Sequence, residues 1–333
     1  MGPIHDPVYI SEVGLEEETE ADEEPFYEEL DPDFEDTLGA FKTSNPKGNR
    51  LQRNFIHVSN EMSKFRKTIE TVLVVHGWET PAKTVPMTLI VLGVGLDCQA
   101  QNFRFESVRM WLGFYEDDEA DPPNTEPAAP QVVAWAPFVQ QEHWDEAEEA
   151  IEQNDVKGGA VGVEYVAKAE AKLERETKRS YTRKHFDRGS TDRLVHDDKV
   201  YGINWYCEQN GLQKYGVKPY FHIAVLLKRS HTKTNEPITF KGIFDMRVEA
   251  GFIHDFNEGR RRAFRLGRPE DDPVYYDPTL DDQVGGIQGS GQALLKKVKK
   301  DNLGDLARGQ RLSSLLDPNG TLSGLEPLEP KKA

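Results

Sequence analysis

The sequence predicts an all-β fold, an antiparallel β-sandwich over about residues 60–260, with a disordered acidic N-terminal tail and a partly helical C-terminal extension. Short segments rich in β-branched and aromatic residues recur between turns that contain Gly and Pro. The acidic excess is concentrated at one end of the chain, and the strand-like patterns stop at about residue 268. We therefore expect three regions, residues 1–50, 60–260 and 269–333.

The N-terminal tail, residues 1–50, carries nearly all of the excess charge. The whole chain has a net charge of −17, whereas residues 41–333 have 43 acidic and 41 basic residues, a net of −2. Closely spaced carboxylates repel and bury little surface, so we expect disorder here. Interleaved aromatic residues such as Phe26 and Tyr27 also suit a tail that docks on a partner or on its own domain. The nearly neutral body excludes neither anionic nor cationic partners.

Seven segments of the central region have the composition of β-strands. They are residues 68–78, 87–98, 103–115, 132–138, 200–207, 219–228 and 238–250. The second is almost continuously apolar, as in a strand buried on both faces, and the third alternates between apolar and polar residues. Gly93 and Gly95 lie inside the apolar run and indicate close packing rather than a phosphate loop. Many short strands with long polar loops favour an antiparallel sandwich.

Two segments are ambiguous. The Ala and Glu content of residues 144–154 predicts a helix. Between Val161 and Leu173, apolar residues recur at every second position with charged residues opposite, which predicts an amphipathic strand. Residues 167–177 also have the composition of a helix, so both interpretations stay open, and we favour the strand.

The C-terminal extension contains the predicted helix. Residues 285–291 have the glycine content of a linker, and residues 294–316 set leucines against lysines in the pattern of a basic amphipathic helix. Gly304 and Gly309 weaken its continuity. Leu312, Leu315 and Leu316 match a short helical docking motif, but the pattern recurs by chance and we favour ordinary helix packing.

The compartment is predicted to be cytoplasmic or nuclear rather than extracellular. The first residues have neither a basic region nor a long apolar run, as a signal peptide would. Only Cys98 and Cys207 are available for a disulfide, and no stretch is apolar enough to span a bilayer as a helix.

Two stretches together resemble a known group of proteins. The first comprises residues 102–116 followed by 131–138, and the second runs from Gly202 to Lys228 and includes Asn204, Trp205 and Tyr206. Their layout is similar to that of uncharacterised β-sandwich proteins from filamentous ascomycete fungi. The resemblance covers about residues 65–250. It implies a fungal source and a β-rich fold, and it implies no activity.

No catalytic or metal-binding motif is evident. The nine histidines are scattered without metal-ligand spacing, and Asp197 and Asp198 in a polar stretch are more typical of a turn than of a metal site. No nucleophile elbow, phosphate loop or dinucleotide fingerprint occurs. We therefore expect no cofactor and no metal, although catalytic groups that converge only in space would escape this reasoning.

The densest basic cluster is a run of arginines after the last predicted strand. It comprises Arg260, Arg261, Arg262, Arg265 and Arg268, with Phe264 among them. Guanidinium groups at this density could bind phosphate or nucleic acid. They could instead bind the acidic N-terminal tail of the same chain, which we favour over phosphate or nucleic acid. A solvated loop is the third interpretation.

Three functions remain open on the sequence alone. We rank first a non-enzymatic intracellular module that binds a protein partner and is regulated by its charged tails. The amphipathic segment from Val161 to Leu173 suggests a membrane-acting, pore-forming-like β protein instead. That function needs a paired second strand, and residues 178–195 are highly charged. An enzyme whose site is not visible in the sequence is the third.

Overall fold

The computed structural model describes residues 43–46, 51–59, 64–99, 103–117, 129–139, 141–155, 177–230, 236–251 and 271–316. The predicted acidic tail therefore lies outside the described residues except for residues 43–46. The ambiguous segment from Val161 to Leu173 also lies outside them.

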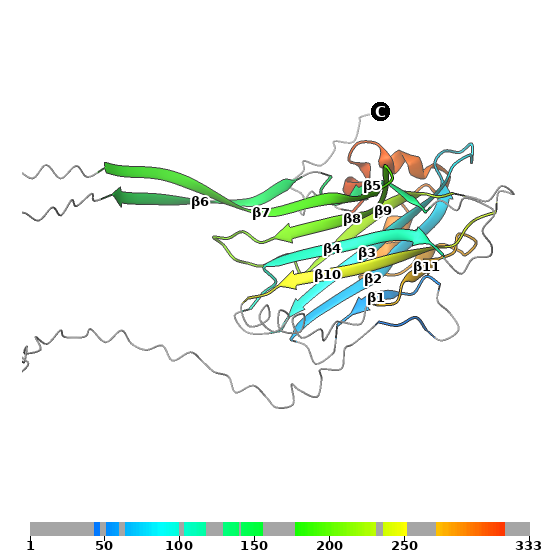
Figure 1. The fold of residues 1–333 in the computed structure, drawn as a ribbon, viewed down its shortest axis with the longest axis horizontal. Helices are drawn as coiled ribbons and strands as arrows, with labels where there is room; N and C mark the ends of the chain where they lie inside the picture. The colour runs from blue at the N-terminus through cyan, green and yellow to red at the C-terminus, as the bar shows by residue number, and fades with distance from the viewer. Residues whose placement is uncertain are drawn as a thin grey trace, which may run out of the picture. The chain divides into compact units, whose positions relative to one another are not determined.

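Two antiparallel sheets pack face to face (Figure 1). In sheet order, the first sheet consists of β1 (Phe55–Val58), β2 (Phe65–Trp78), β3 (Pro86–Cys98), β9 (Tyr220–Lys228) and β5 (Gln131–Ala136), with β12 (Gln283–Val284) paired to β2. The second consists of β11 (Val274–Tyr276), β10 (Phe240–Glu249), β4 (Ser107–Glu116), β8 (Lys199–Glu208), β7 (Thr177–His196) and β6 (Glu142–Asp155). The predicted β-sandwich is confirmed.

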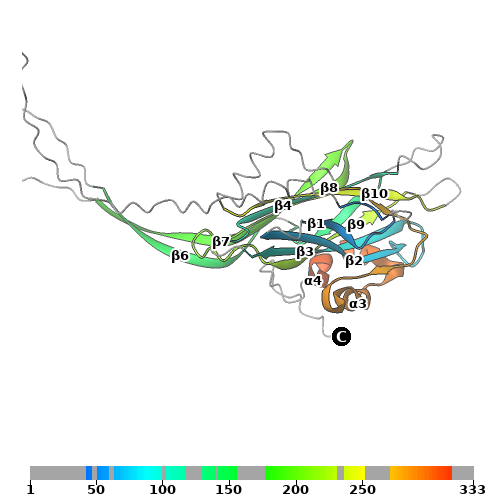
Figure 2. The same cartoon turned by 90° about the horizontal axis from the view of Figure 1, so that it is seen from below.

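The first sheet is buried on both faces. Its inner face meets the second sheet in a core that includes Val74, Ile90 and Val225. Its outer face packs against the C-terminal helices, as Figure 2 shows from below. Two-sided burial explains why β3 and β9 are almost continuously apolar, since neither face has to meet water.

The C-terminal extension is the layer that covers this outer face. It forms η1 (Ile287–Gly289), α3 (Ser290–Leu295), η2 (Lys300–Ala307) and α4 (Arg311–Leu316). Leu294, Leu303, Leu312 and Leu315 are buried in the cluster that these helices form with β2, β3 and β9. The helical pattern of residues 294–316 thus corresponds to several short helices, with Gly304 inside η2 and Gly309 between η2 and α4. Residues 285–291, interpreted above as a linker, instead pack on β2, where the Gly285 amide donates to the Val72 carbonyl at 2.9 Å.

The second sheet has one buried and one exposed face. Met110, Ile203 and Trp205 on its inner face are fully buried. Its outer face carries polar and aromatic side chains, among them Arg247, whose guanidinium carbon lies 4.9 Å from the centre of the Trp111 ring. Buried and exposed residues therefore alternate along strands such as β10, as expected for an antiparallel sheet with one face in water.

All seven predicted strands occur, with shifted ends. The third begins at Ser107 rather than at residue 103. Close packing at Gly93 is confirmed, because a β-carbon there would lie 2.5 Å from the Tyr220 hydroxyl. The short strands β1, β11 and β12 have too few residues to show a period, which explains why the sequence did not indicate them.

The helix predicted for residues 144–154 is wrong. This segment is strand β6, which pairs with β7 in an antiparallel ladder from Glu142–Gly189 to Asp155–Thr177. The Ala and Glu content expresses a local preference that amounts to tenths of a kcal/mol per residue. Pairing with a strand distant in sequence overrides that preference.

The hairpin arm and the polar hollow at its root

The most distinctive part of the structure is a two-stranded ribbon that leaves the sandwich. Strand β7 pairs with β8 only from Arg188 to His196, and residues closer to its start pair with β6 alone. In both views β6 and β7 continue beyond the ends of β4 and β8 (Figures 1 and 2). We call residues 146–155 of β6 and 177–186 of β7 the arm.

The two strands of the arm carry opposite charges. Residues 146–155 include five Asp or Glu and no Lys or Arg, whereas residues 177–186 include four Lys or Arg and no Asp or Glu. The Lys184 ammonium lies 3.2 Å from the Glu146 carboxylate and 3.8 Å from that of Glu148. The hydrogen bond and charge of Glu146 raise the pKa of Lys184. Charge pairing between these side chains thus contributes to the stability of the ladder.

Aromatic packing fixes the part of β6 and β7 that adjoins the sandwich, residues 142–145 and 187–191, which we call the root of the arm. The Phe138 ring, 1% exposed, stacks on Trp144 of β6 with ring centres 5.3 Å apart. A β-carbon at Gly189 of β7 would lie 2.5 Å from this ring, so only glycine allows β7 to pass so close. The Thr191 hydroxyl accepts a hydrogen bond from the Trp135 indole at 2.9 Å and donates one to the Phe138 carbonyl. These contacts tie the arm strands to β5 of the opposite sheet.

A buried carboxyl group lies at the same root. Glu142, the first residue of β6, is 8% exposed, and neither of its side-chain oxygens forms a well-aligned hydrogen bond within the described residues. Burial raises the pKa of Glu142 to about 7, an effect that the backbone N–H of Val139 only partly offsets. This carboxyl group therefore changes charge near neutral pH.

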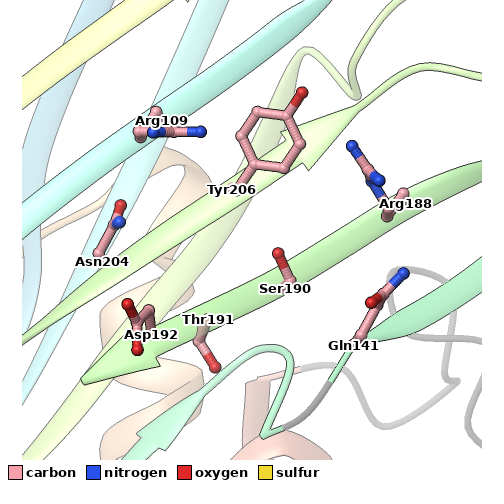
Figure 3. A pocket seen from close by; sticks show the side chains of 8 residues that line it. All are labelled: Arg109, Gln141, Arg188, Ser190, Thr191, Asp192, Asn204 and Tyr206. Atoms are coloured by element: carbon pink, nitrogen blue, oxygen red, sulfur yellow. The ribbon is translucent and has the colours of Figure 1, made fainter.

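A polar hollow of about 400 Å³ opens on the outer face of the second sheet beside this root. Its lining comprises Arg109, Gln141, Arg188, Ser190, Thr191, Asp192, Asn204 and Tyr206 (Figure 3). Register explains the arrangement, since Tyr206 of β8 lies opposite Arg109 of β4 on one side and Ser190 of β7 on the other.

Two cations flank one aromatic ring in this hollow. The guanidinium carbons of Arg109 and Arg188 lie 5.1 and 5.3 Å from the centre of the Tyr206 ring (Figure 3). Arg188 also forms an ion pair with Glu208. Burial raises the pKa of the Tyr206 hydroxyl, which therefore stays protonated at neutral pH.

The chemistry of the hollow is that of a binding surface. Guanidinium groups bind phosphate or carboxylate, and Asp192 and Asn204 can bind hydroxyl groups. The Nε of Arg188 and the Oδ1 of Asn204 are both buried without a hydrogen-bond partner among the described residues. Of the described residues that line the hollow, none is a histidine, cysteine or lysine.

Other buried titratable groups belong to the core. His76, whose pKa burial lowers to about 3, hydrogen-bonds to Thr88 and Gln52. Burial raises the pKa of Cys207 to about 12, so this thiol is unreactive near neutral pH. Within the described ranges no group of three His, Cys, Asp or Glu residues is placed to hold a metal ion.

The residues singled out in the sequence are not brought together into a site. Arg260, Arg261, Arg262, Arg265 and Arg268 lie outside the described residues, so anion or tail binding by this run stays a prediction. Asp197 and Asp198 form the tight turn between β7 and β8, with φ of 46° and 60°. Among the described helices, none has the length and apolar character needed to cross a bilayer.

Sequence reasoning did not identify the arm or the hollow. A signal for the arm was present, since a segment whose charged residues are all acidic and one of similar length whose charged residues are all basic flank residues 156–176. No comparable signal indicates the hollow, because its residues come from three strands and meet only through sheet register.

Comparisons with known proteins do not assign this chain to a family. No protein-family model and no curated protein matches it. Among solved structures, it is matched to the Clostridium perfringens NetB toxin in the membrane inserted form, with a TM-score of 0.22 and 9% sequence identity over 56% of this chain and 80% of that chain. So slight a similarity carries no argument about fold or function. Neither finding bears on the resemblance to fungal β-sandwich proteins, which stays a prediction.

Proposed function

We propose that this chain is a membrane-acting β protein whose arm presents the segment between β6 and β7 to a lipid bilayer. The observation that carries the proposal is the β6–β7 ladder, which leaves the sandwich as a two-stranded ribbon. An isolated two-stranded ribbon is at best marginally stable in water, so such an arm needs a further binding partner or environment. The ladder brings the two ends of residues 156–176 side by side, because Asp155 lies opposite Thr177.

The register of the arm supports this role for the adjoining segment. Ala147 lies opposite His185 and Asp155 opposite Thr177, so odd-numbered residues of the two strands share one face. If residues 156–176 extended the same ladder in a bilayer, the odd-numbered apolar residues from Val161 to Leu173 would also fall on one face. Each extended strand would then have about ten residues, the length that a tilted β-strand needs to cross a bilayer.

Lipid would contact the apolar face of this extension, and water the charged one. Val161, Val163 and Leu173 have odd numbers, whereas Lys168, Glu170 and Lys172 have even numbers. Alternation of this kind is typical of strands that separate lipid from an aqueous interior. The arm has charged residues at both odd and even positions and would stay in water, joining the sandwich to the inserted segment.

Dye release from lipid vesicles tests the proposal. Full-length protein is added to vesicles of phosphatidylcholine, alone or with phosphatidylserine, and should release the dye. Replacing Val161, Val163 and Leu173 with Ser removes about 1 kcal/mol of apolar transfer energy per residue, so release should fall by roughly 10- to 100-fold. The matched control replaces Lys168, Glu170 and Lys172 with Ser and should release dye nearly as well as the wild type. No release by the wild type, or equal loss in both variants, would overturn the proposal.

A second candidate function is the protein-interaction module ranked first from the sequence. The polar hollow on the outer face of the second sheet favours it, because Arg109 and Arg188 can pair with acidic side chains of a partner. Repeating the vesicle experiment at about 0.05 M and about 0.5 M salt, with binding and dye release both measured, separates attachment through charge from insertion. Charge-based docking weakens strongly over that range, whereas insertion of an apolar face does not.

A further inference from the structure

Within the described residues, no strand other than β6 and β7 pairs with the arm, so the ribbon has two outer edges of opposite charge. In the described part of the second sheet β6 is the last strand, and the arm residues of β7 pair only with β6. One edge of the ribbon is therefore the acidic strand, residues 146–155, and the other is the basic strand, residues 177–186. Exposed strand edges pair readily with other strands.

A second copy of the chain can join the arm in three ways. Pairing β6 with β6 of the second copy places two acidic strands side by side, and pairing β7 with β7 places two basic strands side by side. Like charges directly opposite each other destabilise a ladder by roughly 0.2–1 kcal/mol per pair. Only the pairing of β6 with β7 of the next copy places opposite charges together, repeating the arrangement already present within each arm.

We propose that copies of this chain associate head to tail through their arms, the acidic β6 of one copy pairing with the basic β7 of the next. Every acidic strand then lies between two basic strands. A head-to-tail contact leaves one unused edge at each end of the assembly, so further copies add until a ring closes or an open filament forms. The repulsion between like strands excludes the two-fold symmetric alternatives.

The charges that carry this contact are accessible in the single chain. The side chains of Glu146, Glu148 and Lys184 are 55%, 63% and 59% exposed although they pair with one another. Lys184 already contacts two carboxylates, and the acidic strand has one charged residue more than the basic strand. Because these ion pairs are exposed, the same side chains are also accessible to a strand of a neighbouring copy.

A charge-swap variant tests the direction of pairing. It replaces Glu146, Glu148, Glu149 and Glu152 with Lys, and Lys178, Arg179, Arg183 and Lys184 with Glu. Attraction within each arm and the net charge of the chain are both preserved, so the variant should keep the thermal unfolding midpoint of the wild type. Its acidic and basic edges are exchanged.

The readout is the composition of cross-linked pairs. Equal amounts of heavy-nitrogen-labelled wild type and unlabelled swap variant are mixed on phosphatidylcholine–phosphatidylserine vesicles, cross-linked and weighed by mass spectrometry. Every head-to-tail contact between the two forms joins like charges. Mixed pairs should therefore fall about ten-fold or more below the half expected from random mixing.

Three results would overturn the inference. Two-fold pairing makes mixed pairs the commonest species, because β6 of the two forms then carries opposite charges. Random mixing means that these charges do not select the partner, and wild type that forms no pairs at all excludes the contact. The inference rests on the proposed function only in that the copies are mixed on a vesicle surface. Cross-linking measures pairing between copies, whereas dye release measures damage to the bilayer. Selective pairing without dye release would overturn the proposed function alone.

Discussion

The two halves of strand β7 show how one strand can depend on two different kinds of stabilisation. From Arg188 to His196 it pairs with β8 and contributes Gly189 and Thr191 to the contacts with Phe138. From Thr177 to Phe186 it pairs only with β6, opposite an acidic strand. The first half is stabilised by its ladder with β8 and by the contacts of Gly189 and Thr191 with Phe138, the second by its ladder with β6 and by charge. The stability of the second half therefore depends most on the partner, a further strand or a bilayer, that binds the arm.

The same contrast separates β3 from β6. Strand β3 is buried on both faces, whereas arm residues of β6 such as Glu146 and Glu148 are exposed. Burial of an apolar side chain contributes about 1.5–3 kcal/mol, and an exposed ion pair contributes at most about 1 kcal/mol. Substitutions in the sandwich and in the arm should therefore differ in both size and kind.

The largest effect is expected for Trp205→Ala. Trp205 lies on β8, is fully buried and belongs to the core between the sheets. Its removal should lower the free energy of unfolding by about 3–5 kcal/mol, measured by urea denaturation. The milder Trp205→Phe should lose less. A loss below about 1 kcal/mol for Trp205→Ala would mean that this core does not hold the two sheets together.

Glu142→Gln, at the junction of the sandwich and the arm, should have a smaller effect of opposite sign. The folded state raises the pKa of Glu142 to about 7, so folding favours the protonated form. Wild-type stability should therefore fall as pH rises from about 4.5 to about 7, because the unfolded chain loses this proton first. At about pH 8 the variant should be more stable than the wild type by roughly 1–3 kcal/mol, with little difference at about pH 4. Urea denaturation at both pH values measures this, and an equal effect at both would exclude titration of Glu142 as the cause.

Prediction from the sequence succeeded where burial leaves a local pattern. Two-sided burial makes β3 and β9 nearly continuous apolar runs, and one-sided burial makes β10 alternate. It failed at β6, where Ala147, Glu148 and Glu149 suit a helix and only the ladder with β7 makes them a strand. No pattern within fourteen residues can report a partner that lies on the far side of residues 156–176.

The hollow could not be predicted because it depends on register. Arg109, Arg188 and Tyr206 are distant in sequence, and the ring lies between the two guanidinium groups only because β4, β8 and β7 are adjacent. A shift of one residue in either ladder would move one of these side chains to the other face of the sheet. Composition and spacing contain no information on that register.

The smallest effect on folding is expected for Lys184→Ala. Lys184 lies on the arm, and its ion pairs with Glu146 and Glu148 are exposed, so solvent screens them. The thermal unfolding midpoint of the single chain should stay within about 1 °C of the wild type. If head-to-tail pairing is correct, the same variant should still weaken cross-linking between copies, because it removes a cation from the basic edge. A lowered midpoint with unchanged cross-linking would instead assign these charges to the hairpin alone. Changed cross-linking at a constant midpoint would assign them to the contact between copies.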